Sequence, residues 1–505
     1  MKISELLPNA VIPDEAAMIE PSKLSSRTED IARGTLFFLT EGIAYDKRRL
    51  LPYILAKRPL AIVVPTDTKA LGYNIPIIYA ENVRRAYAEA LFRFYGLEKT
   101  KMKFIAITGT NGKTTTATML WEILRRNGLH AGLIGTGKIL LDDNTLSAPY
   151  YSMTTPDPEI LYPALAEMDT RGCQFVVMEA SSHALALEKL TPLFFDAAIF
   201  TNLSAEHLDF HKSMENYYRS KARLFEKTRL AILNNDDSYA RRLSEECNCE
   251  TLRVGALYPG EVAAKNIEGS GLGGCSYMYT SNGPKFFVHL AIPGIYQIYN
   301  SMLALSAAIS LGIAPCKAKK ALESITEIPG RLHLVSQTDI SVYVDYAHTP
   351  EALLSSLKEA NASKESGQRI WLIFGCGGER DREKRPKMAE IAEKNADSVI
   401  LTLDNCRGES PMQILKDTVA GFRNKKSVRV ISDRKKAIRH AILAMQRADT
   451  LIIAGKGHEV YTIDKTGYHP FDERKIILDA LKERKGGHTV LYENQADNTH
   501  LRQGN

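Results

Sequence analysis

A segment rich in glycine and threonine has the residue types and the spacing to bind phosphate groups. Its residues are Gly109, Thr110, Asn111, Gly112, Lys113, Thr114 and Thr115. Glycines at a turn let backbone N–H groups approach phosphate oxygens, and a helix that starts there adds partial positive charge. Lys113 would reach the outer phosphates of a nucleotide, and the Thr114 hydroxyl would ligate Mg²⁺. The segment predicts a phosphate-binding loop, in a variant with only two residues between the glycines.

Two elements must flank this loop to position it. The apolar run 104–107 indicates a buried strand, and the residues after Lys113 place Met119, Leu120, Ile123 and Leu124 on one helical face. The alternative is a glycine turn with a surface lysine. That alternative does not explain a strand before the turn and an amphipathic helix after it, so the context favours the phosphate-binding loop.

Further polar residues gather where later strands are expected to end. Strands at 175–179, 197–201 and 230–234 alternate with helical stretches, which predicts a mostly parallel sheet with helices on both faces. Such sheets bind ligands beyond the carboxyl ends of their strands. Glu179 and His207 are candidate ligands there, because their donor atoms suit Mg²⁺ or Mn²⁺ beside ATP phosphates. A single Glu or His at a strand end is more often only a hydrogen-bonded polar residue.

The region 332–505 repeats the alternation of strands and helices. Its expected strands are 341–345, 371–374, 398–402, 428–431 and 451–454. This pattern predicts a Rossmann-like layer with a second ligand site, although its glycines lack the order typical of dinucleotide binding. Arg380, Arg407 and Glu459 offer two cations and one anion, which the carboxylate and ammonium of an amino acid would satisfy. Charged strand ends that simply face water remain the alternative.

Length and composition limit the classes of protein that fit. At 505 residues the chain exceeds one core, and we expect domains at 1–99, 100–331 and 332–505. The net charge of +6 is too mild to indicate a nucleic-acid partner and suits an anionic small substrate. No apolar run approaches the ~18 residues of a membrane span, and no two of the seven cysteines form a C-x-x-C pair. We therefore expect a cytoplasmic protein without a membrane partner, structural zinc or disulfides.

Several short polar motifs follow one another along the chain, at 107–115, 154–156, 178–183, 201–211, 328–331, 345–350 and 375–381. Taken in this order, they resemble the motifs of the Mur ligases, enzymes of peptidoglycan precursor synthesis. The resemblance spans nearly the whole chain and is closest to the members that add the third residue of the stem peptide. It implies an α/β architecture with an N-terminal UDP-binding domain, a central ATP-binding domain around a mostly parallel sheet, and a C-terminal Rossmann-like domain that binds the amino acid.

Position by position, the resemblance implies roles that the motifs do not assign by themselves. The residues expected to contact the UDP-linked dipeptide are Leu24, Ser26, Thr154, Thr155, Ser181 and Lys189. Besides the phosphate-binding loop, the residues expected to hold ATP are Asn300, Arg331 and Asp345. The residues expected to contact the incoming amino acid are Arg380, Asp404, Asn405, Arg407, Gly455 and Glu459.

The resemblance also implies two Mg²⁺ ions and one modified lysine. Lys221 matches a lysine that the family carbamylates, which turns an ammonium group into a metal-binding carbamate. By itself, the helical segment around Lys221 predicts a lysine that faces solvent. Thr114, Glu179 and His207 would complete the metal site, and the catalytic set would be Lys113, Glu179, His207 and Lys221.

The implied enzyme is a monomeric ATP-dependent ligase that serves cell-wall biogenesis, and with it cell shape and division. It would join meso-2,6-diaminopimelate to the D-Glu of UDP-N-acetylmuramoyl-L-Ala-D-Glu through an acyl phosphate. Arg407 would pair with the distal carboxylate of diaminopimelate, and Glu459 with its distal ammonium. The chain departs from the usual family pattern at three positions, with Lys189 for arginine, Gln297 for asparagine and Cys406 for proline.

Several alternatives stay open. The same reaction with L-lysine or another diamino acid is the nearest of them. A ligase that adds D-Ala-D-Ala, or a folate-polyglutamate relative, is more distant. From another class, the chain could be a P-loop kinase or a nucleotide-dependent switch. The C-terminal arginines are the feature that a kinase or a switch does not explain.

Overall fold

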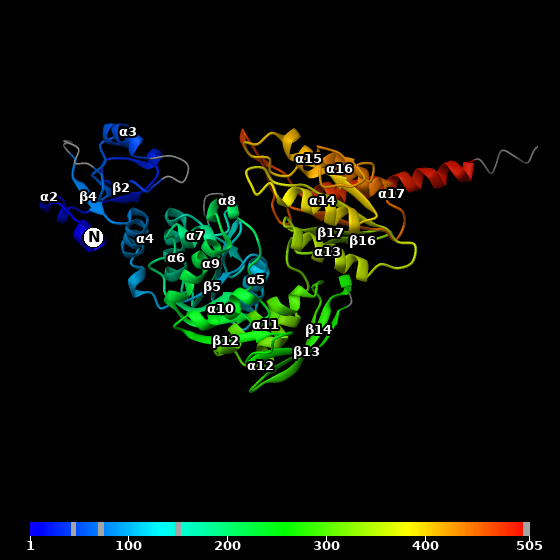
Figure 1. Ribbon diagram of the computed structural model, residues 1–505, viewed down its shortest axis with the longest axis horizontal. Helices are drawn as coiled ribbons and strands as arrows, with labels where there is room; N and C mark the ends of the chain where they lie inside the picture. The colour runs from blue at the N-terminus through cyan, green and yellow to red at the C-terminus, as the bar shows by residue number, and fades with distance from the viewer. Residues whose placement is uncertain (42–46, 69–74, 147–152, 270, 498–505) are drawn as a thin grey trace, which may run out of the picture. The chain divides into compact units, whose positions relative to one another are not determined.

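The computed structural model in Figure 1 describes residues 1–41, 47–68, 75–146, 153–269 and 271–497, with side chains described up to residue 485. The chain forms two compact units. The segments of the first unit are Met1–Leu203, Glu215–Val254 and Leu303–Ala314. The segments of the second unit are Ser204–Met214, Gly255–Met302 and Pro315–Asn505. The expected division into three domains stays a prediction.

The N-terminal part of the first unit is a four-stranded parallel sheet. In spatial order its strands are β1 (Lys23–Ser25), β2 (Thr35–Phe38), β3 (Ala61–Pro65) and β4 (Ile77–Ala80). Helix α4 (Val83–Phe94) begins after Asn82, whose side chain accepts a hydrogen bond from the Arg85 N–H and so caps the helix. Tyr87 of α4 packs on Phe38 of β2.

A second, larger sheet of the first unit has the order β12-β11-β10-β5-β9-β6-β7-β8. Its strands are β5 (Lys103–Thr108), β6 (Ala131–Gly135), β7 (Lys138–Leu141), β8 (Asn144–Thr145), β9 (Phe175–Glu179), β10 (Phe195–Phe200), β11 (Thr228–Asn234) and β12 (Glu250–Gly255). The strands from β12 to β6 are parallel, whereas β7 and β8 are antiparallel. The predicted mostly parallel sheet is confirmed, and its carboxyl edge carries the polar clusters.

Helix α5 (Lys113–Arg126) starts at the end of the glycine-rich loop and packs on β5, β6 and β9. It buries Met119, Leu120, Ile123 and Leu124, as the apolar spacing predicts. The other helices of this unit are α1 (Ile3–Leu6), α2 (Asp14–Ala17), α3 (Leu51–Ala56), α6 (Pro158–Thr170), α7 (Ser182–Ala186), α9 (Met214–Ala222) and α10 (Ser238–Glu246). Its 3-10 turns are η1 (Thr28–Asp30), η2 (Lys47–Leu50), η3 (Leu97–Lys99) and η4 (Arg223–Lys227).

The second unit contains an antiparallel set of strands that the sequence pattern did not predict. They are β13 (Val262–Gly269), β14 (Cys275–Ser281) and β15 (Lys285–Leu290). The helical elements that lie in this unit, wholly or in part, before the C-terminal sheet are α8 (Leu208–His211), η5 (Gly271–Gly273), α11 (Tyr296–Ser310) and α12 (Pro315–Glu323). The residues of α11 are divided between the two units.

The C-terminal sheet has the order β16-β17-β21-β18-β19-β20, parallel except for β16. Its strands are β16 (His333–Gln337), β17 (Ser341–Asp345), β18 (Ile370–Phe374), β19 (Ser398–Leu401), β20 (Val428–Val430) and β21 (Thr450–Ala454). All five predicted strands are present. The edge strand β16 and the hairpin β22 (Tyr461–Asp464) and β23 (Gly467–Pro470) were not predicted.

Helices cover both faces of this sheet (Figure 1). They are α13 (Pro350–Ala362), α14 (Lys384–Asn395), α15 (Pro411–Val419), α16 (Arg434–Ala444) and α17 (Glu473–Asp497). Successive side chains of a strand point to opposite faces. Leu372 and Phe374 accordingly pack with α13, α14 and α15, whereas Ile373 packs with α16 and α17. The predicted Rossmann-like layer is confirmed.

Across the described residues, none of the helices combines the length and the apolar character that a bilayer span requires. The seven cysteines are all free thiols.

Candidate active site

The loop between β5 and α5 has the geometry that phosphate binding requires. Gly109 and Gly112 have φ angles of +141° and +86°, which favour glycine. A Cβ on Gly109 would lie only 1.9 Å from Thr201 Oγ1. Lys113 Nζ donates to the backbone oxygens of Gly109 at 2.9 Å and Thr110 at 2.8 Å, so its ammonium lies within the loop. The strand, loop and helix are confirmed, and the nucleotide contacts stay a prediction.

Residues at the end of β10 hold this loop in place. Asn202 accepts a hydrogen bond from the Asn111 N–H at 2.9 Å and donates to the Asn111 carbonyl at 3.1 Å. The Thr201 hydroxyl donates to the same carbonyl at 2.6 Å. Thr110 Oγ1 lies 3.2 Å from the Tyr217 hydroxyl. The loop is therefore fixed by hydrogen bonds on several sides, and the sequence motifs had indicated no role for Thr201, Asn202 or Tyr217.

Glu179, the last residue of β9, is buried and directs its carboxylate at the start of α5. Its Oε2 accepts the Thr114 hydroxyl at 2.9 Å, and its Oε1 accepts the Thr136 N–H at 3.1 Å. Thr136 follows β6 and was not predicted, because the sequence does not show which strands are neighbours. Carboxylate and hydroxyl oxygens are the donors that Mg²⁺ prefers. Glu179 and Thr114 thus fit the implied metal.

A metal site here needs oxygen atoms from a bound substrate as well. In the described part of the chain, no three His, Cys, Asp or Glu side chains are close enough together to hold a metal ion. Mg²⁺ is usually bound by one or two carboxylates, while substrate phosphates and water complete its shell. One buried carboxylate beside a phosphate-binding loop satisfies that requirement.

A row of hydroxyl groups extends from Glu179. Thr136 Oγ1 donates to Thr154 Oγ1 at 3.2 Å, and Thr155 Oγ1 donates to the Glu179 carbonyl at 2.8 Å. The Ser181 N–H donates to Thr155 Oγ1 at 3.0 Å. The structure therefore brings the predicted residues Thr154, Thr155 and Ser181 together with Glu179 at one edge of the sheet.

Lys221 corrects one interpretation of the sequence, because it is buried with 1% of its surface exposed and does not face solvent. From α9, its Nζ donates to the Gly109 carbonyl at 2.8 Å and lies 3.5 Å from Thr108 Oγ1. The centre of the Tyr217 ring lies 4.8 Å from the nitrogen. A buried amine needs such partners, and here they come from a segment about 110 residues away. The spacing within α9 does not reveal them.

Four of the predicted ATP or metal contacts lie in the second unit. They are His207, Asn300, Arg331 and Asp345. The Arg331 guanidinium lies 4.8 Å from the centre of the Tyr346 ring, and Asp345 accepts the Ser356 hydroxyl. Burial raises the pKa of Asp345. Contacts of these four residues with the phosphate-binding loop stay a prediction.

A second cluster of charges lies beyond the carboxyl ends of β19 and β21, around the fully buried Lys456. Lys456 Nζ donates to Asn405 Oδ1 at 2.8 Å and forms an ion pair with Asp404 at 3.1 Å. Asn405 Nδ2 in turn donates to Glu459 Oε2 at 2.9 Å. Burial, and then the charge of Asp404, raise the pKa of Glu459. Lys456 joins the predicted residues Asp404, Asn405 and Glu459, and it was not predicted to have a role.

The two predicted arginines both lie close to Gly377. A Cβ on Gly377 would lie 3.0 Å from Arg407 Nη1 and 3.7 Å from Arg380 Cγ. Arg407 Nη1 donates to the Gly378 carbonyl at 2.9 Å and to the Asn405 carbonyl at 3.3 Å. Burial, and then the charge of Arg407, lower the pKa of Arg380. The structure therefore gathers two cations and the anionic Asp404–Glu459 group in one unit.

Hydrogen bonds to the hairpin hold the backbone around Cys406, where the family pattern has proline. The Arg407 N–H donates to the Ile463 carbonyl at 3.0 Å, and the Ile463 N–H donates to Asn405 Oδ1 at 3.0 Å. Arg407 has a φ of +52°, which is costly without such support. Strand β22 thus restrains the segment that a proline would stiffen.

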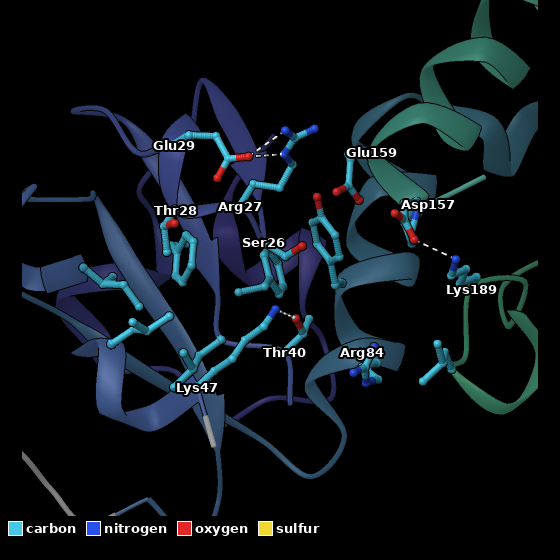
Figure 2. A pocket seen from close by; sticks show the side chains of 18 residues that line it. Ser26, Arg27, Thr28, Glu29, Thr40, Lys47, Arg84, Asp157, Glu159 and Lys189 are labelled. Atoms are coloured by element: carbon cyan, nitrogen blue, oxygen red, sulfur yellow. Dashed lines mark hydrogen bonds and ion pairs between the residues drawn. The ribbon is translucent and has the colours of Figure 1, made fainter. Parts of the chain in front are cut away.

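A cavity of about 380 Å³ lies in the first unit (Figure 2). Ser26 and Lys189, both predicted substrate contacts, line it. Figure 2 shows Lys47 against Thr40, at 3.3 Å, and Lys189 against Asp157, at 2.6 Å. The other charged lining residues are Arg27, Glu29, Arg84 and Glu159. Leu24, the remaining predicted contact, is buried in β1 and does not line this cavity.

Known proteins are similar to this chain in sequence and in fold. Models of the Mur ligase middle domain and of the Mur ligase glutamate ligase domain match residues 107–308 and 330–457. The UDP-N-acetylmuramoyl-L-alanyl-D-glutamate--2,6-diaminopimelate ligase 1 of Clostridium acetobutylicum is 36% identical over 471 residues, which cover 92% of this chain and 95% of that protein. The similarly named ligase of Lactiplantibacillus plantarum is 37% identical over 492 residues, covering 95% and 97%.

Solved structures of related proteins have a similar fold. A structure of a UDP-N-acetylmuramoyl-L-alanyl-D-glutamate--2,6-diaminopimelate ligase aligns with a TM-score of 0.68 at 28% identity, covering 96% of this chain and 99% of that chain. The MurF ligase of Thermotoga maritima in complex with ADP shares the fold, with a TM-score of 0.60 at 17% identity over 92% and 98% of the two chains. The chain belongs to the Mur ligase family.

Proposed function

We propose that the protein is an ATP-dependent ligase that joins meso-2,6-diaminopimelate to the D-Glu of UDP-N-acetylmuramoyl-L-Ala-D-Glu. The observation that carries the proposal is the charge cluster of the second unit. Its anionic residues Asp404 and Glu459 suit an ammonium group, and Arg380 and Arg407 suit carboxylates. Lysine lacks a distal carboxylate and would leave one arginine without a partner, which disfavours lysine as a substrate.

ATP bound at the phosphate-binding loop would supply the energy for the new amide bond. ATP transfers its γ-phosphoryl group to the D-Glu γ-carboxylate, which releases ADP and forms an acyl phosphate. The amine of diaminopimelate attacks the carbonyl carbon of the acyl phosphate. The amide C–N bond forms, the C–O bond to phosphate breaks, and the amine nitrogen gives up a proton. Lys113 stabilises the charge on the transferred group, and the hydroxyls of Thr154, Thr155 and Ser181 orient the acceptor.

Two Mg²⁺ ions would neutralise phosphate charge in this site. Thr114 and Glu179 fit one ion, because both present oxygen donors beside the loop. We propose His207 and a carbamylated Lys221 as further ligands. Lys221 is suited to that role by its place, because its buried amine lies 2.8 Å from the Gly109 carbonyl of the phosphate-binding loop.

We further infer that the cavity of the first unit holds the UDP moiety. Ser26 lines it, and Lys47 and Arg84 offer cations to a diphosphate (Figure 2). Lys189 would contact the muramoyl-peptide from the same cavity. The proposal is completed by domains at 1–99, 100–331 and 332–505 for UDP, ATP and amino acid, by a monomeric state, and by a cytoplasmic location, where ATP is available.

The proposal is tested by phosphate release from ATP. The purified protein is incubated with Mg²⁺ and UDP-N-acetylmuramoyl-L-Ala-D-Glu, together with meso-diaminopimelate, with L-lysine, or with no amino acid. We expect release that depends on diaminopimelate, and a product whose mass is that of the tripeptide. Release with lysine instead would overturn the assignment of the second unit's charge cluster. Release that needs no amino acid would indicate a nucleotide hydrolase or switch.

Replacing Arg407 should weaken binding of the amino acid and leave binding of ATP and of the UDP-linked substrate nearly unchanged. We expect Arg407→Met to lower kcat/KM for diaminopimelate by about 10²-fold or more, because a carboxylate loses a charge-assisted partner. The KM values for ATP and for the UDP-linked substrate should change less than about twofold. Arg423→Met, at an exposed arginine of the same unit, is the matched control. Equal effects on all three substrates would contradict the assigned role.

Gly135, at the end of β6, offers a test of Glu179 as a metal ligand. A Cβ at Gly135 would lie 2.3 Å from Glu179 Oε1, so Gly135→Ala must displace the carboxylate. We expect the Mg²⁺ concentration for half-maximal activity to rise about tenfold or more. The control is Gly132→Ala in the same strand, whose Cβ would meet the flexible Met168 thioether at 2.6 Å. An unchanged Mg²⁺ requirement in Gly135→Ala would exclude Glu179 from the metal site.

A further inference from the structure

Arg385 is a fully buried arginine whose contacts join several segments of the second unit. It lies on α14 with no exposed surface. Its Nη1 and Nη2 donate to the two oxygens of Glu409, at 2.8 and 2.7 Å, as a bidentate pair. Nη1 also donates to Asp417 at 2.8 Å, and Nη2 donates to the Gly377 carbonyl at 3.3 Å. A buried arginine with this number of partners fixes the segments that it contacts.

Glu409 lies two residues after Arg407 and binds the loop that carries Arg380. Its Oε2 accepts the Glu379 N–H at 3.0 Å, and its Oε1 accepts Arg382 Nη2 at 2.7 Å. Its own N–H donates to the Cys406 carbonyl at 3.1 Å. The hydrogen bond from Arg385 holds the pKa of Glu409 at about 2, so the carboxylate stays ionised at neutral pH. Glu409 therefore links the loop 377–382 to the loop 404–409.

The link through Glu409 opposes an electrostatic repulsion between the two loops. They present Arg380 and Arg407 close to Gly377, and the two like charges repel each other. Glycines at 377 and 378 leave the first loop with little stiffness of its own. The loops also touch, since a Cβ on Gly378 would lie 2.0 Å from the Cys406 carbonyl oxygen. Hydrogen bonds from the Gly378 N–H to the Asn405 carbonyl and from Arg407 to the Gly378 carbonyl, both at 2.9 Å, join the loops, and Glu409 adds a charged anchor at the Glu379 N–H.

We propose that Glu409 and Arg385 are positioning residues that hold Arg380 and Arg407 at the spacing required to bind the carboxylate groups of the incoming amino acid, a role that rests on the proposed amino-acid site. Neither side chain contacts the substrate in this scheme. Both act through the backbone of the loop 377–382, which Glu409 binds at the Glu379 N–H and Arg385 binds at the Gly377 carbonyl.

Glu409→Gln tests the proposal, because it keeps the shape of the side chain and removes its charge. We expect KM for diaminopimelate to rise about tenfold to a hundredfold, because Arg380 and Arg407 would no longer be held in the positions that bind its carboxylates. The KM values for ATP and the UDP-linked substrate should stay within about twofold. The matched control is Arg382→Met, which removes the exposed partner of the same carboxylate and leaves the buried pair intact. We expect its kinetics to be unchanged.

A role that is only structural would give a different result. In that case Glu409→Gln would lower the folded fraction or kcat and leave KM for diaminopimelate unchanged, which would overturn the proposal. If Glu409→Gln fails to fold, Asp417→Asn serves as the second variant. It weakens the ion pair between Arg385 and Asp417 and leaves the pair between Arg385 and Glu409 in place. It should raise the same KM by a smaller factor, and no change would again overturn the proposal.

The proposed function is checked separately in the same assay. If Arg407→Met raises KM for diaminopimelate and Glu409→Gln does not, the amino-acid site is correct and the positioning role is wrong. If Arg407→Met has no effect on that KM, the amino-acid site itself is wrong.

Discussion

Replacing Lys113 with alanine is expected to lower kcat by about 10³-fold or more, a larger loss than we expect for any other single substitution. The Lys113 ammonium lies within the loop, close to the Gly109 and Thr110 carbonyls, and a bound nucleotide would place its outer phosphates at this loop. Phosphoryl transfer depends mainly on positioning and on neutralising charge, so removal of this cation acts directly on the transition state. Phosphate release under saturating substrates measures the effect.

Lys103→Ala is the matched control for this variant. Lys103 is an exposed lysine at the start of β5, the strand that leads into the loop. We expect it to retain the activity of the unaltered protein, while Lys113→Ala keeps its folded structure by circular dichroism and loses activity. Activity of Lys113→Ala within about tenfold of the unaltered protein would remove the lysine from the phosphoryl-transfer step.

Replacing Lys221 should cause the second largest loss, about 10²-fold or more in kcat, for either methionine or arginine. Methionine fills the buried space without an amine. Arginine keeps a positive charge, but its guanidinium stays protonated and does not form a carbamate. If a carbamate is required, both variants fail. If only a cation beside the Gly109 carbonyl is required, Lys221→Arg remains active.

Intact mass spectrometry and one control complete this test. The unaltered protein should carry the added mass of one CO₂ under native conditions, and the Lys221 variants should not. Lys227→Met, at an exposed lysine that donates to the Thr191 carbonyl, should behave like the unaltered protein. Full activity of Lys221→Arg would contradict the carbamate and leave the buried amine as a structural group.

Local patterns in the sequence determined much of the fold and part of the site. Strand β5, the glycine-rich loop and helix α5 follow from an apolar run, two glycines and a helical apolar spacing, all within 24 residues. The strands of the C-terminal sheet follow in the same way from short apolar runs. Glu179 and Glu459 were identifiable because each stands at or shortly after the end of such a run.

Residues whose role depends on distant partners were not identifiable. Thr136 bonds to Glu179 because β6 and β9 are neighbours, and that order is a property of the sheet. Lys456 carries no local sign that it is buried among Asp404, Asn405 and Glu459. The three antiparallel strands from β13 to β15 were also missed, since their half-exposed faces carry weaker apolar patterns than the buried parallel strands.

Lys221 has one property that follows from the local sequence and another that depends on the tertiary structure. The sequence determined that it lies on a helix, because spacing along a helix depends only on nearby residues. Tertiary structure alone decided that its amine is buried against the Gly109 carbonyl, more than 100 positions away. The same holds for Arg385 and Glu409, whose side chains gain their roles only when two loops meet. Burial and pairing arise from contacts between distant segments, and no local pattern encodes which segments those are.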